Sequence, residues 1–288
     1  MKKKRYTHLL LLLPFIFIAV LITAAIITVI LQSLGYVPAF GLETLTLSYY
    51  LSVLTDSSFL ASLSASLKIA LFSSVFSAIL GTALCAALVS GKQSASLIMV
   101  RIPILVPHAI VAVFMINIFS QTGIISRIMF AFGLIDDYSH FTQILFTENY
   151  LGVILAYLWK EIPFIAYFTF ALMASIKDTF GEAAQNLGAS PLKSFFQITL
   201  PLSMPSILNA FFIIFIFSFG GYELPLLLGS TVPKALPVET YMSFSSPDLL
   251  DRPYSMAMNG VILFISLAFT VVYIALTKKM TRSLGGIQ

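Results

Sequence analysis

Six stretches of apolar residues, each long enough to cross a lipid bilayer, constrain this 288-residue chain more than any other feature. A helix needs about 20 apolar residues to cross the hydrocarbon core. Lipid offers no hydrogen-bond partner to an open backbone, so each stretch is expected to be helical. The stretches cover residues 9–31, 59–89, 102–119, 151–176, 206–228 and 256–277. The sequence therefore predicts an all-α membrane protein with six transmembrane helices, forming one domain over residues 1–288.

The composition agrees with a lipid environment and argues against other classes of protein. Hydrophobic residues make up 59% of the chain and charged residues 10%, which leaves too little polar surface for water. The basic residues are scattered between the spans, with no basic patch of the kind that binds nucleic acid. One cysteine, Cys85, and three widely separated histidines provide no metal-ligand spacing. We expect no nucleic-acid partner and no metal site.

The distribution of Lys and Arg predicts the orientation of the spans. If the basic start of the chain is cytoplasmic, eleven of the 16 Lys and Arg residues fall on inner segments and three on outer loops. The inner residues are Lys2, Lys3, Lys4, Arg5, Lys92, Arg101, Lys177, Lys193, Lys278, Lys279 and Arg282. Both termini are therefore predicted to be cytoplasmic. The first apolar stretch is too long for a signal peptide and is expected to be an uncleaved anchor.

The inner loop over residues 177–205 is far longer than a connection between two spans requires. Thr179 and Glu182 have the spacing of a capping box, which predicts a short helix from about Phe180 that ends near Gly188. Ser190-Pro191 predicts the start of a second helix, with Ser as the cap and Pro in the first turn. The loop is thus expected to be a helix, a tight turn and another helix.

Two outer loops also carry local signals. Apolar residues between Ile124 and Phe132 share one helical face, which predicts a short surface helix. The last outer loop contains Pro233, Pro237, Pro247 and Pro253, which favour an extended path over a helix.

The inner loop also resembles the EAA loop of ABC importer permeases. The matching residues are Glu182, Ala183, Ala184, Gly188, Ile198 and, after Leu200, Pro201, each at the spacing of that motif. The segment from Trp159 to Phe164 is similar to one often found in the fourth span of these permeases. The resemblance implies a type I importer permease fold, and it implies that the loop carries the coupling helix that docks on an ATPase.

The resemblance implies partners that this chain lacks. They are two cytoplasmic ATPase subunits, a second permease subunit that is related or identical, and an extracytoplasmic substrate-binding protein, assembled in the cytoplasmic (inner) membrane of a bacterium. The chain has no phosphate-binding G-x-x-x-x-G-K-[ST] loop, so ATP would be used by the partner subunits. We expect a transport subunit that is not an enzyme and binds no cofactor of its own.

Ionisable residues within the spans are candidates for the substrate pathway, because such groups are costly in lipid. Lys160 and Glu161 lie in the fourth span, where each either bonds a neighbouring helix or meets substrate. Tyr222 and Glu223 follow two glycines that are expected to break the fifth helix in its outer half. Glu223 either lines the pathway, which would favour a cationic substrate, or reaches the outer interface.

The function remains open between two classes at this stage. The resemblance favours an importer permease for a small solute, closest in character to permeases for polyamines, with iron, thiamine and organophosphonate as further substrates. The alternative is a stand-alone secondary transporter that uses Lys160, Glu161 and Glu223 to relay ions. A membrane enzyme would need a catalytic motif, and the sequence contains none of the common ones.

Overall fold

The computed structural model describes residues 3–91 and 93–285. Within them the chain is helical, with no strand beyond one isolated bridge between Val37 and Leu42. Two of the basic residues used to predict the orientation, Lys2 and Lys92, lie outside the described residues. The prediction of an all-α fold is confirmed.

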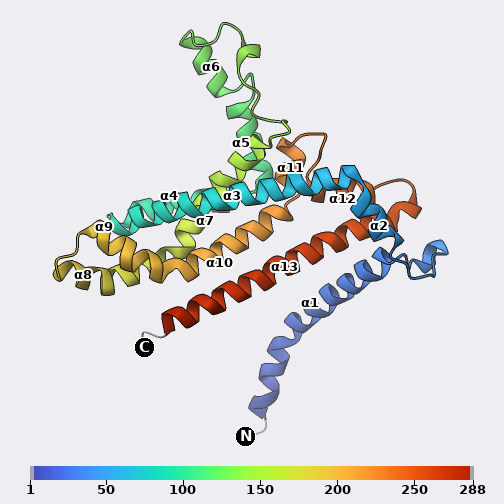
Figure 1. Ribbon diagram of the computed structural model, residues 1–288, viewed down its shortest axis with the longest axis horizontal. Helices are drawn as coiled ribbons and strands as arrows, with labels where there is room; N and C mark the ends of the chain where they lie inside the picture. The colour runs from blue at the N-terminus through green and yellow to red at the C-terminus, as the bar shows by residue number, and fades with distance from the viewer. Residues whose placement is uncertain (1–2, 92, 286–288) are drawn as a thin grey trace. The chain divides into compact units, whose positions relative to one another are not determined.

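The main helices appear in Figure 1 under the labels used below. The first half of the chain contains α1 (Lys3–Ser33), α2 (Ser48–Thr55), α3 (Ser57–Ser90), α4 (Gln93–Leu105), α5 (His108–Phe119) and α6 (Ile124–Ala131). The second half contains α7 (Leu151–Ile176), α8 (Glu182–Asn186), α9 (Pro191–Ser194), α10 (Leu200–Phe219), α11 (Glu223–Leu228), α12 (Leu236–Phe244) and α13 (Arg252–Gly285). Three short 3₁₀ turns cover Pro38–Phe40, Tyr138–His140 and Leu249–Asp251.

Six helical segments of the described chain are long and apolar enough to cross a membrane. They are Leu11–Ser33, Ser57–Ser90, His108–Ala131, Leu151–Asn186, Pro191–Phe219 and Leu249–Met280. Their number confirms the predicted six spans.

The third span is not the single helix predicted over residues 102–119. It breaks between α4 and α5, because Pro107 has an extended backbone (φ −59°, ψ 147°) and carries no amide hydrogen to continue the helix. Proline also disfavours the helical conformation of the residue before it, here Val106. The predicted break in the fifth helix is confirmed, since α10 ends at Phe219 and α11 begins at Glu223.

The inner loop differs from the prediction at its start. Thr179 begins no new helix, because α7 continues through one wide π-helical turn (Lys177–Gly181) directly into α8. The predicted capping box is therefore wrong: the backbone there is already helical and leaves no free amides to cap. The other two signals are confirmed: Gly188 adopts a left-handed φ of 92°, and the Ser190 hydroxyl accepts a hydrogen bond from the Lys193 amide.

The two outer loops gave one correct and one wrong prediction. The surface helix expected from Ile124 exists as α6. The loop expected to be extended contains α12, in which Pro237 is the second residue. Proline is tolerated in the first turn of a helix, where its missing amide hydrogen would have no partner anyway.

The chain divides into two compact units, each described here by itself, and the prediction of a single domain over residues 1–288 stays a prediction. The first unit comprises Met1–Leu60 and Glu239–Phe264. Its polar contacts lie near the ends of α1, α2 and α3: Tyr50 donates a hydrogen bond to Ser33 (2.8 Å), and Tyr254 donates one to Asp56 (2.6 Å). Asp56 also accepts the amide of Ser58 at 2.8 Å and so caps α3.

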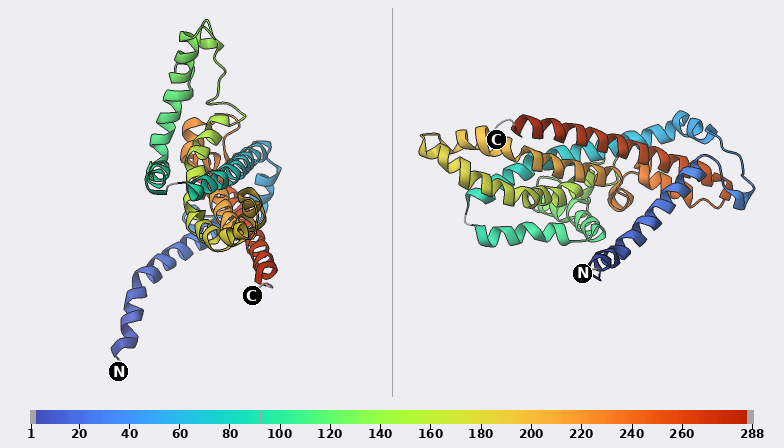
Figure 2. Two further views of the ribbon diagram at one scale, coloured as in Figure 1. Left: turned by 90° about the vertical axis from the view of Figure 1, so that its left-hand side faces the viewer. Right: turned by 90° about the horizontal axis from the view of Figure 1, so that it is seen from below.

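The second unit comprises Ala61–Val238 and Ile265–Gln288. Its central element is α7, which packs against α4, α5, α10 and α11. Gly81 of α3 allows close contact with α7, because an added Cβ would lie 2.8 Å from the Ile162 carbonyl oxygen. The hairpin of α8 and α9 closes one end of α7 and α10 (Figure 1), while α6 projects away from α7 in both Figure 1 and the left view of Figure 2.

We predict that Asp56→Ala lowers the free energy of unfolding by about 1–2 kcal/mol, because it removes a helix cap and the acceptor of a hydrogen bond from Tyr254. The hydrogen bond from Tyr254, followed by that from the Ser58 amide, lowers the pKa of Asp56. This carboxylate therefore stabilises the fold above the unfolded pKa of about 4, and the contribution is lost as the pH falls through the folded value. Thermal unfolding in detergent between pH 3 and 7 measures it. Equal stability of variant and parent at pH 7 would contradict the prediction.

Candidate coupling loop and membrane cavity

The inner loop forms a compact helical hairpin rather than an irregular insertion. One arm is the continuation of α7 through α8, and the other is α9, a second π-helical turn (Phe195–Thr199) and α10. Buried Ser194 joins the arms by donating a hydrogen bond to the Gly181 carbonyl oxygen (3.0 Å). A Cβ on Gly181 would lie 3.3 Å from the Ser194 hydroxyl, so glycine permits this close contact. The hairpin is therefore rigid at its base.

The residues of the EAA-like pattern occupy different places on the hairpin. Glu182 begins α8 and is exposed, as is Ala183. Ala184, Gly188 and Ile198 lie together along a cavity of about 300 Å³ between the two arms. Pro201 is the second residue of α10 and does not line that cavity. The structure thus brings three of the six predicted residues together.

Sequence reasoning missed the apolar tip of the hairpin. Leu187 is 90% exposed and Leu192 is 72% exposed, on either side of the turn at Gly188. Large apolar side chains this open, on a turn held by a rigid base, are typical of a surface that another protein covers. Their positions next to the turn at Gly188 were the sequence signal that could have predicted this exposed apolar tip.

A third helix is tied to the base of the hairpin through Lys177. Its ammonium group donates a hydrogen bond to the Val89 carbonyl oxygen (3.0 Å), one residue before α3 ends. Such carbonyls at a helix end have no amide donor within the helix, and a cation there also complements the helix dipole. α3, α7 and α10 therefore all meet at this base.

Deeper in the second unit, Glu161 joins the same three helices. Its side chain is buried, with 4% of the residue exposed, and accepts hydrogen bonds from Ser77 of α3 (3.2 Å) and from Ser218 of α10. A buried carboxyl group is tolerated when donors satisfy it. Glu161 therefore acts as a structural link between helices, which is one of the two roles considered for it.

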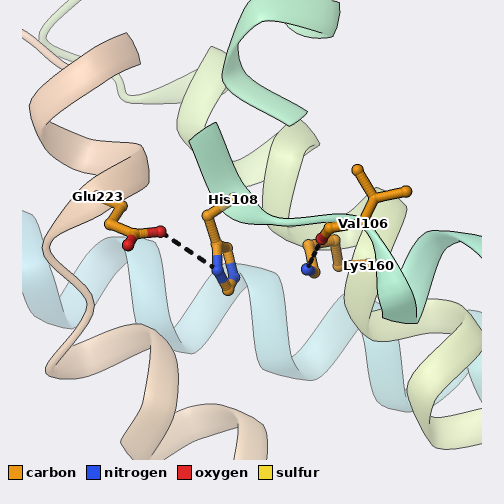
Figure 3. A network of polar contacts seen from close by, with 4 residues as sticks. All are labelled: Val106, His108, Lys160 and Glu223. Atoms are coloured by element: carbon orange, nitrogen blue, oxygen red, sulfur yellow. Dashed lines mark hydrogen bonds and ion pairs between the residues drawn. The ribbon is translucent and has the colours of Figure 1, made fainter. Parts of the chain in front are cut away.

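Lys160 bonds a different neighbour from Glu161, as expected for adjacent helix residues that point about 100° apart. Its ammonium group donates to the Val106 carbonyl oxygen, in the break between α4 and α5. The break frees carbonyl groups that would otherwise accept helical amides. Lys160 thus satisfies one of them, and Figure 3 shows this contact.

Glu223 lies on a cavity of about 530 Å³ where the two broken helices face each other. It is the first residue of α11, and His108 is the first residue of α5. The His108 Nδ1 and Glu223 Oε2 atoms are 3.5 Å apart (Figure 3). Tyr222, the other predicted pathway residue of this segment, also lines the cavity, whereas Lys160 and Glu161 do not. The sequence reading missed His108, although Pro107 just before it was a signal for a break.

Six apolar helical segments, with helix breaks at Pro107 and at Gly220–Tyr222 beside a cavity that contains His108 and Glu223, define a multi-pass α-helical membrane protein. The family of binding-protein-dependent transport system inner membrane components matches residues 79–282. That range is more than half of the chain. The chain belongs to this family.

Individual relatives are more distant. The sulfate transport system permease protein CysT of Synechocystis sp. is 25% identical over 174 residues, covering 60% of this chain and 57% of the relative. The spermidine/putrescine transport system permease protein PotC homolog of Mycoplasma genitalium is 30% identical over 118 residues, covering 41% of this chain and 40% of the relative. The matched region thus spans less than two thirds of these relatives.

Solved structures also match almost the whole chain, and one of them is representative. It is a bacterial ABC transporter involved in the import of the acidic polysaccharide alginate, with a TM-score of 0.77, 20% identity, and coverage of 98% of this chain and 96% of that one. At this identity the likeness shows the fold, which is that of an ABC importer permease.

We predict that Glu161→Ala lowers the free energy of unfolding by about 2–4 kcal/mol, because it leaves the hydroxyl groups of Ser77 and Ser218 without their acceptor in a buried site. Glu161→Gln keeps a carbonyl acceptor and should cost less. Thermal unfolding of the purified chain in detergent measures both. Ser52→Ala, which removes an exposed hydroxyl, is the control. An alanine variant as stable as this control would show that Glu161 links nothing of consequence.

Proposed function

We propose that this chain is a permease subunit of an ATP-driven ABC importer and forms half of a translocation pathway for a small solute. It would not catalyse a reaction itself, because ATP would be hydrolysed by two cytoplasmic ATPase subunits. A second permease subunit would complete the pathway, and an extracytoplasmic binding protein would deliver the solute. Both termini and the α8–α9 hairpin would then lie in the bacterial cytoplasm.

The observation that carries this proposal is the inner hairpin. It combines the spacing from Glu182 to Pro201 with a rigid base at Ser194 and an apolar tip at Leu187. A hairpin that continues two spans without a flexible joint is suited to receive a movement from a docked partner and pass it into the membrane. Small side chains at Ala183 and Ala184 allow such a partner to approach the backbone closely.

The alternative of a stand-alone secondary transporter is less well supported. It requires Lys160, Glu161 and Glu223 to relay ions. Two of these are engaged by neighbouring helices, Lys160 with Val106 and Glu161 with two serines, which leaves Glu223 for that role. That alternative also leaves the exposed hairpin without a role.

We predict that the double variant Glu182→Lys, Gly188→Val abolishes ATP-driven uptake and loses the ATPase on purification. The first change reverses the charge of an exposed contact residue. The second places a β-branched residue at a φ of 92°, at a cost of about 1–3 kcal/mol. The tagged chain is purified from membranes of cells that also contain the ATPase, and bound ATPase and uptake are both measured.

Glu43→Lys, a charge reversal on an exposed residue far along the chain from the hairpin, is the matched control and should retain both properties. Full ATPase binding and full uptake by the double variant would refute the proposed coupling role.

We also predict that Lys177→Met keeps the ATPase bound but raises the amount of ATP hydrolysed per molecule transported. The reason is that it removes the bond from the hairpin base to α3 without altering the exposed tip. Lys177→Arg, which retains a donor, should restore most of the parental ratio. An unchanged ratio of ATP hydrolysed to molecules transported in Lys177→Met would show that coupling does not depend on the bond between the hairpin and α3.

A further inference from the structure

The cavity between the two broken helices has the chemistry of a ligand site. Its volume is about 530 Å³. The residues that line it are His108, Tyr157, Ile216, Phe217, Gly220, Gly221, Tyr222, Glu223 and Leu224. Aromatic rings, the backbone of two glycines and one carboxylate are thus combined in one place.

Glu223 supplies the charge of this cavity. Its side chain is 61% exposed, while the side chain of His108 beside it is 21% exposed. The separation of 3.5 Å between His108 Nδ1 and Glu223 Oε2 is long for a hydrogen bond. Much of the carboxylate therefore remains open toward the cavity.

Aromatic side chains form the wall next to this carboxylate. The rings of His108 and Phe217 stack with centroids 5.3 Å apart, and the His108 ring meets Tyr157 edge-on at 6.5 Å. Gly221 makes room for Tyr157, since an added Cβ would lie 2.0 Å from the phenolic oxygen. Of these rings, Tyr157 is buried in the helix packing, whereas Phe217 is 52% exposed.

The other charged groups nearby do not line the cavity. Figure 3 shows Lys160 on the opposite side of His108 from Glu223, with its ammonium group on Val106. Glu161 accepts hydrogen bonds from two buried serines. Among the residues that line the cavity, Glu223 is the one acidic side chain.

We infer that this cavity binds the protonated amine of an organic cation during transport. A carboxylate beside aromatic rings attracts an ammonium group both by charge and through the faces of the rings. An oxyanion such as sulfate would meet the repulsion of Glu223 at the same place. The inference deepens the proposed function and rests on it, because it names the substrate class of the importer.

A cysteine placed in the cavity tests this charge preference directly. Gly220→Cys is suited to the purpose, because the residue is exposed and an added Cβ would lie no closer than 3.5 Å to another atom. The native Cys85 is fully buried and should stay unlabelled, which Cys85→Ala confirms as a background. The purified full chain is labelled with two methanethiosulfonates, one carrying trimethylammonium and one carrying sulfonate.

We expect the cationic reagent to label the cysteine faster than the anionic reagent does. Glu223→Gln should lower the ratio of the cationic to the anionic labelling rate by roughly tenfold. Spermidine, at an ionic strength matched with sodium chloride, should slow labelling at least about threefold, while sodium sulfate should not. An unchanged ratio in Glu223→Gln, or protection by sulfate alone, overturns the inference. If Gly220→Cys resists both reagents, Tyr222→Cys is labelled in the same way, and failure at both sites shows that the cavity is closed to small ions and overturns the inference.

The outcome is separable from that of the proposed function. The chain could bind its ATPase and drive uptake while its cavity is protected by sulfate and not by spermidine. That result would support the proposed function and refute the substrate class. Conversely, spermidine could protect the cavity of a chain that never associates with an ATPase. That result would support the cation site and refute the importer assignment.

Discussion

The buried side chain of Glu161 is the constraint on which the membrane part of the second unit depends. A carboxyl group is costly in the hydrocarbon region unless other helices satisfy it. Here Ser77 and Ser218 donate to it, so α3 and α10 are held against α7 at defined positions. The apolar contacts around this point, such as Gly81 against Ile162, give close packing, and the polar link selects one arrangement among the many that apolar surfaces allow.

The position of the cavity follows from the same link. Ser218 lies one residue before the end of α10, so the break at Gly220–Tyr222 begins beside a fixed point. On the other side, Lys160 holds the carbonyl group of Val106 in the break of the third span. The adjacent residues Lys160 and Glu161 thus fix both breaks to α7. His108 and Glu223 face each other because each begins the helix that follows a break held in this way.

Much of this arrangement could be predicted from the sequence, and the misses have physical reasons. Long apolar stretches predicted the six spans, and Gly220-Gly221 predicted the break in the fifth, because both are local properties of the chain. The break at Pro107 had a local signal that the hydropathy of residues 102–119 concealed. The capping box at Thr179 failed because a local pattern was overruled by the continuing helix of α7.

The roles of individual polar residues were harder to predict, since they depend on contacts between distant segments. Glu161 was considered for both structure and transport, and only the positions of Ser77, 84 residues away, and Ser218, 57 residues away, place it in a structural link. His108 carried no motif at all. It is recognised as a cavity residue because packing brings it to Glu223.

The continuity of the helices argues that movement of the inner hairpin cannot remain local. α7 and α8 form one helical segment from Leu151 to Asn186, and the second arm runs without interruption from Pro191 to Phe219. α10 alone has 20 residues, a length of about 30 Å at a rise of 1.5 Å per residue. Its inner end is fixed to the hairpin, and near its outer end Ser218 is bonded to Glu161. A displacement at Gly188 is therefore carried by rigid helices to the break at Gly220, where the backbone is free to change direction. In the proposed importer, α10 would couple the ATPase site to the cavity at Glu223. The bond from Lys177 to Val89 would make α3 move with the hairpin.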